Sequence, residues 1–171
     1  INDPQAMVFA PSGDLTDDRS QMSLYLADSG LVDQTPHGAS SGEGESASGA
    51  LEMKAQTPGR IIELSFIQPV TLEADAYEAS LVQVIDTSAF SPPSPDPAGI
   101  SYLNSSNTLL MSDSEVNEMP NFLGVNLFEL TLSGTLAYTS STTSFSNEPT
   151  GVAHNPHDGH VFFSDDNSRQ V

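Results

Sequence analysis

Acidic residues recur in this sequence at two matching places, and their carboxylates are the groups best suited to chemistry. One acid precedes a proline, and the other ends a short apolar run. The opening acids are Asp3, Asp96 and Glu148, and the closing acids are Asp28, Asp113 and Asp165. Carboxylate oxygens are the ligands that Ca²⁺ prefers, and flexible geometry suits this cation. A calcium site built from these acids is therefore the first hypothesis.

Further oxygen ligands lie directly after two of the closing acids, in the segments 113–115 and 165–167. The predicted metal ligands are Asp96, Glu148, Asp113, Asp165, Asp166 and Asp3. Purely structural roles are the alternative for both sets of acids. An acid before proline suits a turn that leads into a strand, and a closing Asp can accept hydrogen bonds from backbone N–H groups of the following turn.

Three histidines, His154, His157 and His160, are separated by two residues each. Histidine clusters can bind zinc or copper. The three also span the segment Asn-Pro-His-Asp-Gly, which has the composition of a hairpin turn. A solvent-exposed turn, in which the three rings do not converge, is the alternative.

Two further patterns are weaker. The loop that contains Asp14, Asp17 and Asp18 is acidic, but it lacks the spacing of an EF-hand. Residues 38–42 match the G-x-S-x-G pattern of hydrolases. That pattern needs a strand before the serine and a helix after it, whereas these residues lie in a Gly/Ser-rich run that we interpret as a flexible loop.

Charge and composition exclude several classes of protein. The 171 residues include 4 Lys+Arg and 23 Asp+Glu, a formal net charge of −19, which excludes a nucleic-acid-binding surface and disfavours docking on anionic membranes. The absence of cysteine excludes disulfides and thiolate chemistry. No apolar run approaches the roughly 20 residues that span a bilayer. We expect an extracytoplasmic protein, and we interpret the start at Ile1 as that of a processed or excised piece.

An internal repeat organises the acids. Residues 96–113 align with 148–165 without a gap, and residues 3–28 form a third copy with a longer, Asp-rich middle. A second shared element occurs at 60–66 and 126–132. The spacing of these segments is consistent with one unit that carries three loop insertions in its first copy.

The repeat predicts an all-β fold. Its elements are short, rich in β-branched and aromatic residues, and bounded by Gly, Pro, Asn and Asp. No segment has a capped helical period, so helices should be scarce. Four strands in about 40–50 residues are typical of a β-propeller blade. We predict a propeller-like chain of about three four-stranded blades or part-blades, as a fragment of a larger propeller.

The predicted repeat units cover approximately residues 3–95, 96–147 and 148–171, with a flexible insert at 31–58. Two glutamates, Glu63 and Glu129, match one another in the second shared element. We expect both to be exposed on a blade edge, where charge discourages edge-to-edge pairing. An open set of blades should also leave two unpaired apolar faces exposed.

The segment from Glu148-Pro149-Thr150-Gly151-Val152 to Phe163-Ser164-Asp165-Asp166 resembles the inner hairpin of NHL-like six-bladed propellers. It also resembles secreted bacterial propellers related to SdiA-regulated proteins and to the esterase-like phytase domain. The resemblance covers the three hairpins and two outer strands. It implies a metal-dependent phosphoester or ester hydrolase, in which channel carboxylates hold a cation and a metal-bound water attacks.

We therefore expect a secreted or cell-surface module, located outside the cell or in the periplasm, that binds a partner or has a structural role. Calcium would stabilise it. Its partner would be a protein or glycan ligand, or the remaining blades of the same protein. The alternative function is the hydrolase that the resemblance implies, and fold alone does not decide between the two.

Overall fold

The computed structural model describes residues 1–18, 20–30, 58–67, 78–120 and 122–165. The predicted insert at 31–58 and the G-x-S-x-G segment within it lie outside the described residues, apart from Pro58. The described chain consists of strands and two short 3₁₀ turns, at Thr87–Ala89 and Val116–Glu118. The all-β prediction is confirmed.

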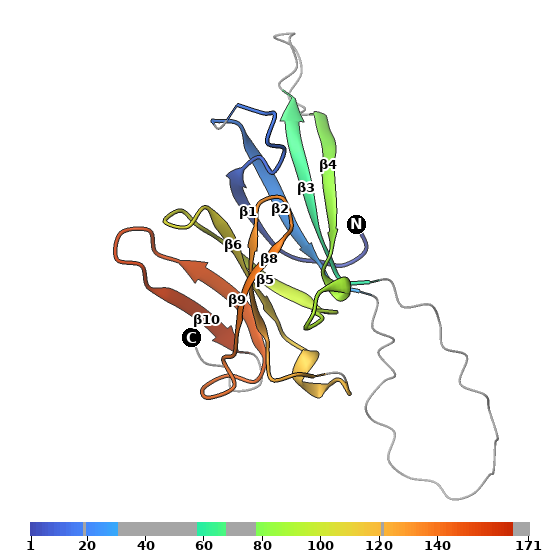
Figure 1. The fold of residues 1–171 in the computed structure, drawn as a ribbon, viewed down its shortest axis with the longest axis vertical. Helices are drawn as coiled ribbons and strands as arrows, with labels where there is room; N and C mark the ends of the chain where they lie inside the picture. The colour runs from blue at the N-terminus through green and yellow to red at the C-terminus, as the bar shows by residue number, and fades with distance from the viewer. Residues whose placement is uncertain (19, 31–57, 68–77, 121, 166–171) are drawn as a thin grey trace, which may run out of the picture.

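The strands form two four-stranded antiparallel sheets and a hairpin (Figure 1). The first sheet contains β1 (Pro4–Pro11), β2 (Met22–Asp28), β3 (Arg60–Ile67) and β4 (Glu78–Asp86). The second contains β5 (Pro97–Leu103), β6 (Thr108–Asp113), β7 (Leu127–Thr131) and β8 (Leu136–Ser140). The hairpin contains β9 (Pro149–His154) and β10 (Val161–Asp165).

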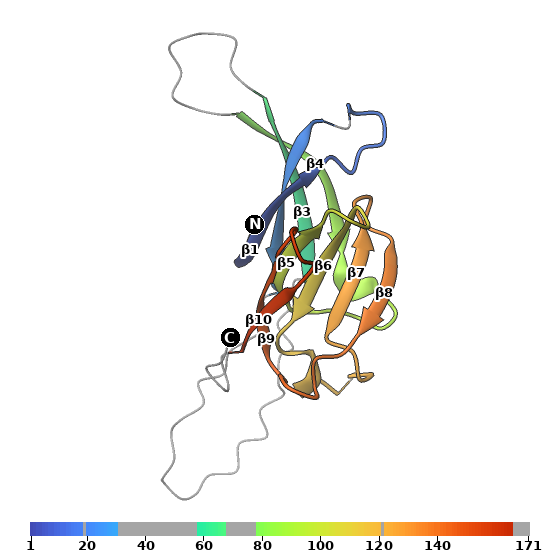
Figure 2. The same cartoon turned by 90° about the vertical axis from the view of Figure 1, so that its left-hand side faces the viewer.

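Each sheet is a meander in which every strand pairs with the next one along the chain. Figure 2 shows β5, β6, β7 and β8 side by side in this order. The first strands of the three units are neighbours, since β5 lies beside both β1 and β9. This arrangement is consistent with blade-like units placed one after another.

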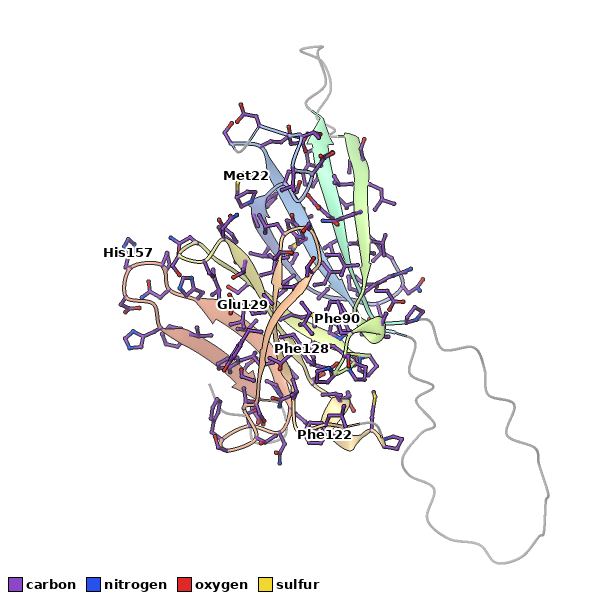
Figure 3. The ribbon with its side chains drawn as sticks, in the orientation of Figure 1. Met22, Phe90, Phe122, Phe128, Glu129 and His157 are labelled. Carbon is purple, nitrogen blue, oxygen red and sulfur yellow. The ribbon has the colours of Figure 1, made fainter. Side chains whose placement is uncertain are left out.

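The hydrophobic core lies between the two four-stranded sheets. Side chains alternate between the two faces of a strand, so only one face of each sheet contributes to it. The first sheet supplies Ala10, Tyr25, Ala27, Ile61 and Ile85, and the second supplies Ile100, Leu109, Met111, Phe128, Leu130 and Leu132. The rings of Phe90 and Phe128, labelled in Figure 3, lie 6.5 Å apart beside this core.

The glycine of the repeated acid-Pro-x-Gly motif allows strands to approach closely. A Cβ atom on Gly99 would lie 2.6 Å from Oγ of Ser112 and 2.7 Å from the backbone nitrogen of Val152 in the hairpin. A Cβ atom on Gly151 would lie 2.5 Å from Oγ of Ser164. The motif therefore pairs a glycine on the first strand with a serine on the second.

The expected exposure of Glu63 and Glu129 on a blade edge is wrong. Both lie on the third strand of their sheet, with a fourth strand paired outside it. Glu63 is fully buried and Glu129 is half-buried. The edge strands on this side are β4 and β8.

Candidate functional site

The closing acid of the first unit fastens the start of that unit. Oδ1 of Asp28 accepts hydrogen bonds from the backbone N–H groups of Asp3 at 2.7 Å and Asn2 at 2.9 Å. Oδ2 accepts a hydrogen bond from Nε of Arg60 at 2.8 Å. The carboxylate of Asp28 therefore joins the strand starts of β1 and β3 at the end of β2.

The closing acid of the second unit repeats this bond. Oδ2 of Asp113 accepts from the backbone N–H of Asp96 at 2.9 Å and from the hydroxyl of Ser94 at 2.7 Å. Oδ1 accepts from the backbone N–H groups of Val116 at 2.9 Å and Glu115 at 3.2 Å. In both units, the closing Asp thus holds the backbone of the opening acid. The sequence left open only bonds from the following turn, which Asp113 forms with Glu115 and Val116.

In both units, the serine that follows the closing acid donates a hydrogen bond from its hydroxyl to the opening acid. Ser29 donates to Oδ2 of Asp3 at 3.1 Å, and Ser114 donates to Oδ2 of Asp96 at 3.1 Å. The hydroxyl of Ser29 also acts to lower the pKa of Asp96. Ser29 therefore influences the opening acids of two neighbouring sheets.

Electrostatics differ between the two units. Burial, the nearby charge of Asp113 and a weaker effect of Glu115 raise the pKa of Asp96 to about 6, against hydrogen bonds from serines. Burial also raises the pKa of Asp113, despite its hydrogen bonds. At Asp28, burial acts in the same direction, but the hydrogen bonds from Arg60 and the backbone outweigh it and lower the pKa.

One residue change in the sequence contributes to this difference. The position of Arg60 in the first shared element is occupied by Asn126 in the second. Asn126 is buried and forms two hydrogen bonds with Thr142, accepting from its N–H at 2.8 Å and donating to its hydroxyl at 2.9 Å. The second unit therefore uses a neutral amide where the first unit places a cation beside its acid.

The predicted metal ligands are only partly brought together. Asp96 and Asp113 are neighbours in one buried cluster, whereas Asp3 is exposed and accepts a hydrogen bond from Ser29. Glu148 and Asp165 lie at the two strand ends of the hairpin, and Asp166 lies outside the described residues. Within the described ranges, no three His, Asp or Glu side chains are grouped as a metal site. The calcium ligands stay a prediction.

The histidines belong to an exposed hairpin turn. Figure 3 shows His157 at the outer tip of the β9–β10 hairpin. Nδ1 of His160 lies 2.9 Å from Oδ1 of Asp158, and both side chains are exposed. The backbone N–H of His157 donates to Oδ1 of Asn155 at 3.0 Å. These contacts are those of turn chemistry.

The acidic loop between β1 and β2 is likewise organised by local turns. Oδ1 of Asp14 accepts hydrogen bonds from the hydroxyl and the N–H of Thr16, at 2.7 Å and 2.8 Å, and these bonds lower its pKa. Asp18 makes the same pair of bonds with Ser20. These bonds hold both carboxylates in Asx-type turns.

A buried polar cluster around Glu63 was not predicted. Oε1 of Glu63 accepts from the backbone N–H of Gly13 at 2.9 Å. Nε2 of Gln83 donates to Oε2 of Glu63 and to the backbone oxygen of Leu132 in the second sheet. Burial and the charge of Glu63 raise the pKa of Tyr25, whose hydroxyl donates to the backbone oxygen of Pro11. This cluster joins the two sheets through a charged group.

The recurrence of Glu63 and Glu129 at one repeat position was the sequence signal for this cluster. Glu129 accepts a hydrogen bond from the hydroxyl of Thr108, so each glutamate has a specific donor. A glutamate that recurs at one position of a repeated strand is compatible with two interpretations. Its side chain can be buried with a specific hydrogen-bond donor, or it can be exposed on an edge strand.

In three comparisons, the chain matched no family model, no curated protein and no solved structure. Among the described residues, there is no helix long and apolar enough to cross a membrane.

Proposed function

We propose that the chain is part of a secreted, acidic β-propeller that acts as a binding or structural module and is stabilised by calcium. The NHL-like resemblance and the succession of blade-like sheets support the propeller. The high acidity supports a location outside the cell or on its surface. The partner of such a module would be a protein or a glycan.

One observation carries the structural part of this proposal. The closing acids Asp28 and Asp113 each accept a hydrogen bond from the backbone of the opening acid in their own unit, at 2.7 Å and 2.9 Å. Carboxylates bonded by backbone N–H groups hold loops in place, and a charged acceptor makes such bonds strong. The recurring acids therefore support a structural role, in which they fix the strand starts of each unit and leave the exposed loops available for binding.

We include calcium in the proposed function because two carboxylates are buried together in the second unit. Asp96 and Asp113 are buried together, and the pKa of Asp96 rises to about 6 through burial and the charge of Asp113. A divalent cation near these carboxylates would offset that repulsion, as carboxylates are its preferred ligands. Arg60, which could neutralise an acid, pairs with Asp28 in the other unit.

Thermal melting tests this proposal. The chain is melted after treatment with EDTA, then with added Ca²⁺, and with Mg²⁺ as the control cation. At Ca²⁺ about 100-fold above Kd, stabilisation is about 2.7 kcal/mol, which raises Tm by roughly 5–10 °C. The Asp96→Asn variant should lose most of this increase. A melting curve unchanged by EDTA and by Ca²⁺ would remove calcium from the proposal.

A hydrolase of the phytase-like propeller type is the second candidate. Its support is the pKa of about 6 at Asp96, because perturbed carboxylates cluster at active sites. A phosphoester or ester assay with added Ca²⁺ discriminates between the two functions. Turnover that is lost in Asp96→Asn and in Glu148→Gln would favour the enzyme, whereas no turnover in the wild-type chain would favour the binding module.

A further inference from the structure

The first sheet has an apolar face turned away from the core. Its exposed side chains are Met7, Phe9, Met22, Phe66, Leu81 and Val84, and we call this the leading face. Met7 is 68% exposed, Leu81 is 61% exposed and Phe9 is 57% exposed. The rings of Phe9 and Phe66 lie 6.1 Å apart on it. A contiguous apolar face of this kind marks an interaction site.

The repeat indicates what the leading face is built to do. In the alignment of the units, Met7 matches Ile100, and Phe66 matches Leu132. The strand pairing agrees, because Met7 lies opposite Leu26 and Ile100 lies opposite the matching Met111. Ile100 and Leu132 are only 4% and 7% exposed, since the second sheet packs this same face on the first sheet. On the leading face, Leu26 and Ile62 at the centre are 9% and 5% exposed, whereas Met7 and Val84 beside them are exposed. The leading face is thus the partly exposed counterpart of a buried interface.

In the buried interface, the second sheet packs on the opposite face of the first sheet, and this receiving surface is also repeated along the chain. On the first sheet it includes Val8 and Tyr25, which pack toward the second sheet. The residues that match these two on the hairpin are Ala153 and Phe162. They lie opposite one another, both are exposed, and Phe162 is 53% exposed. We call this pair of residues the trailing face.

We propose that the leading face of one chain packs on the trailing face of a second copy of the same chain, head to tail. Each copy carries one half of such an interface on its first sheet and, on the two strands of its hairpin, the matching part of the other half. The named side chains of both faces are uncharged on a chain of net charge −19, so their contact buries no carboxylate. A head-to-tail contact generates a ring where the rotation closes and a longer assembly where it does not.

Sedimentation velocity over a concentration series tests the proposal on the full chain at physiological salt, which screens the repulsion between acidic copies. The wild-type chain should shift from monomer to dimer and larger species as concentration rises. Phe9→Glu on the leading face and Phe162→Glu on the trailing face should each weaken association by about tenfold or more. Leu15→Glu is the control, because Leu15 is 91% exposed in a loop outside both faces.

Mixing the two variants tests the direction of the contact. Phe9→Glu retains a trailing face and Phe162→Glu retains a leading face, so an equimolar mixture should form a dimer and nothing larger. Circular dichroism checks that each variant is folded, and Leu81→Glu and Ala153→Glu replace a variant that is not. A monomeric wild-type chain, a mixture that stays monomeric, or unchanged self-association of folded Phe162→Glu would each overturn the proposal. These outcomes do not depend on the calcium test.

Discussion

Nε of Arg60 lies 2.8 Å from Oδ2 of Asp28. This contact distinguishes Asp28 from Asp113, which has the same place in the repeat. The pKa of Asp28 is lowered, whereas that of its counterpart Asp113 is raised. Both carboxylates accept backbone hydrogen bonds, and burial raises the pKa of both. At Asp28 the hydrogen bond and the charge of Arg60 help to outweigh burial, whereas the second unit has Asn126 in the position of this arginine and burial prevails at Asp113.

Arg60→Gln should therefore destabilise the first unit. The carboxylate of Asp28 would stay buried and would lose its charged partner, while its backbone donors remain. Since the guanidinium is partly exposed, we expect a loss of about 1–2 kcal/mol in the free energy of unfolding, measured in urea. Arg60→Lys, which keeps the positive charge, should recover part of it. An equal loss in both variants would assign the effect to Nε geometry and not to charge.

The pKa of Asp96 predicts a pH dependence of stability. Its value of about 6 in the folded chain is above the ordinary value of about 4. The stability that this group contributes is fully present below about pH 4 and is lost as pH rises through about 6. The loss is about 2–3 kcal/mol, measured by urea unfolding between these pH values.

Asp96→Asn should abolish that part of the pH dependence, and at neutral pH it should be more stable than the wild-type chain. The matched control is Asp158→Asn, which changes an exposed turn carboxylate. It should keep the wild-type difference between pH 5 and 7, since hydrogen bonds from His160 lower the pKa of Asp158. A pH profile of Asp96→Asn that follows the wild-type profile would refute this prediction.

Glu63→Ala should be among the most destabilising single substitutions. It leaves the backbone N–H of Gly13 and the amide of Gln83 without their acceptor in a buried place. The expected loss is about 2–4 kcal/mol, measured by chemical denaturation. Glu129→Ala is the matched control from the second unit, and it should cost less because Glu129 is half-buried. Similar losses in the two variants would argue against a special role for the Glu63 cluster.

The glycine–serine pairs predict that the stability lost by a substitution at the glycine can be restored by a second substitution at the serine. Gly151→Ala should cost about 1–3 kcal/mol, because the new Cβ meets the hydroxyl of Ser164. Adding Ser164→Ala should remove most of that cost, as the first unit already has the pair Ala6 and Ala27 in these positions. Thermal melting of the single and double variants measures the rescue.

The same double substitution should fail at the second unit. A Cβ on Gly99 meets both the hydroxyl of Ser112 and the backbone nitrogen of Val152, and only the hydroxyl can be removed. Gly99→Ala with Ser112→Ala should therefore remain unstable. Full recovery there would mean that β5 and β9 can move apart without cost.

The sequence predicted the strands well because their pattern is local. Hairpins such as β5–β6 are marked by turn residues and short apolar runs, and these marks recur in each unit. The bonds of Asp113 with the following turn were one of the alternatives for the same reason, since their donors are near in sequence. The bond between Asp28 and the backbone of Asp3 was not predicted, because its two residues lie 25 positions apart.

The Glu63 cluster could not be predicted in this way. Its donors come from Gly13, 50 positions away, and from Gln83 on the next strand. Their meeting depends on which face of β3 turns toward the second sheet, and a strand with glutamate between apolar residues is equally typical of an exposed edge. The opposite shifts of Asp28 and Asp113 depend similarly on burial, which only the packed sheets define.

The meander order of the sheets has a consequence for how this chain folds. Every described strand pairs with its neighbour along the chain, although residues 29–59 separate β2 from β3 in the first sheet. In the second sheet, whose strands follow one another more closely, loop-closure entropy is lost in smaller steps, and local pairings of this kind form faster than distant ones. Units that contact only their neighbours also open from the ends of the array inward, so amide exchange should be slowest between the first and second sheets.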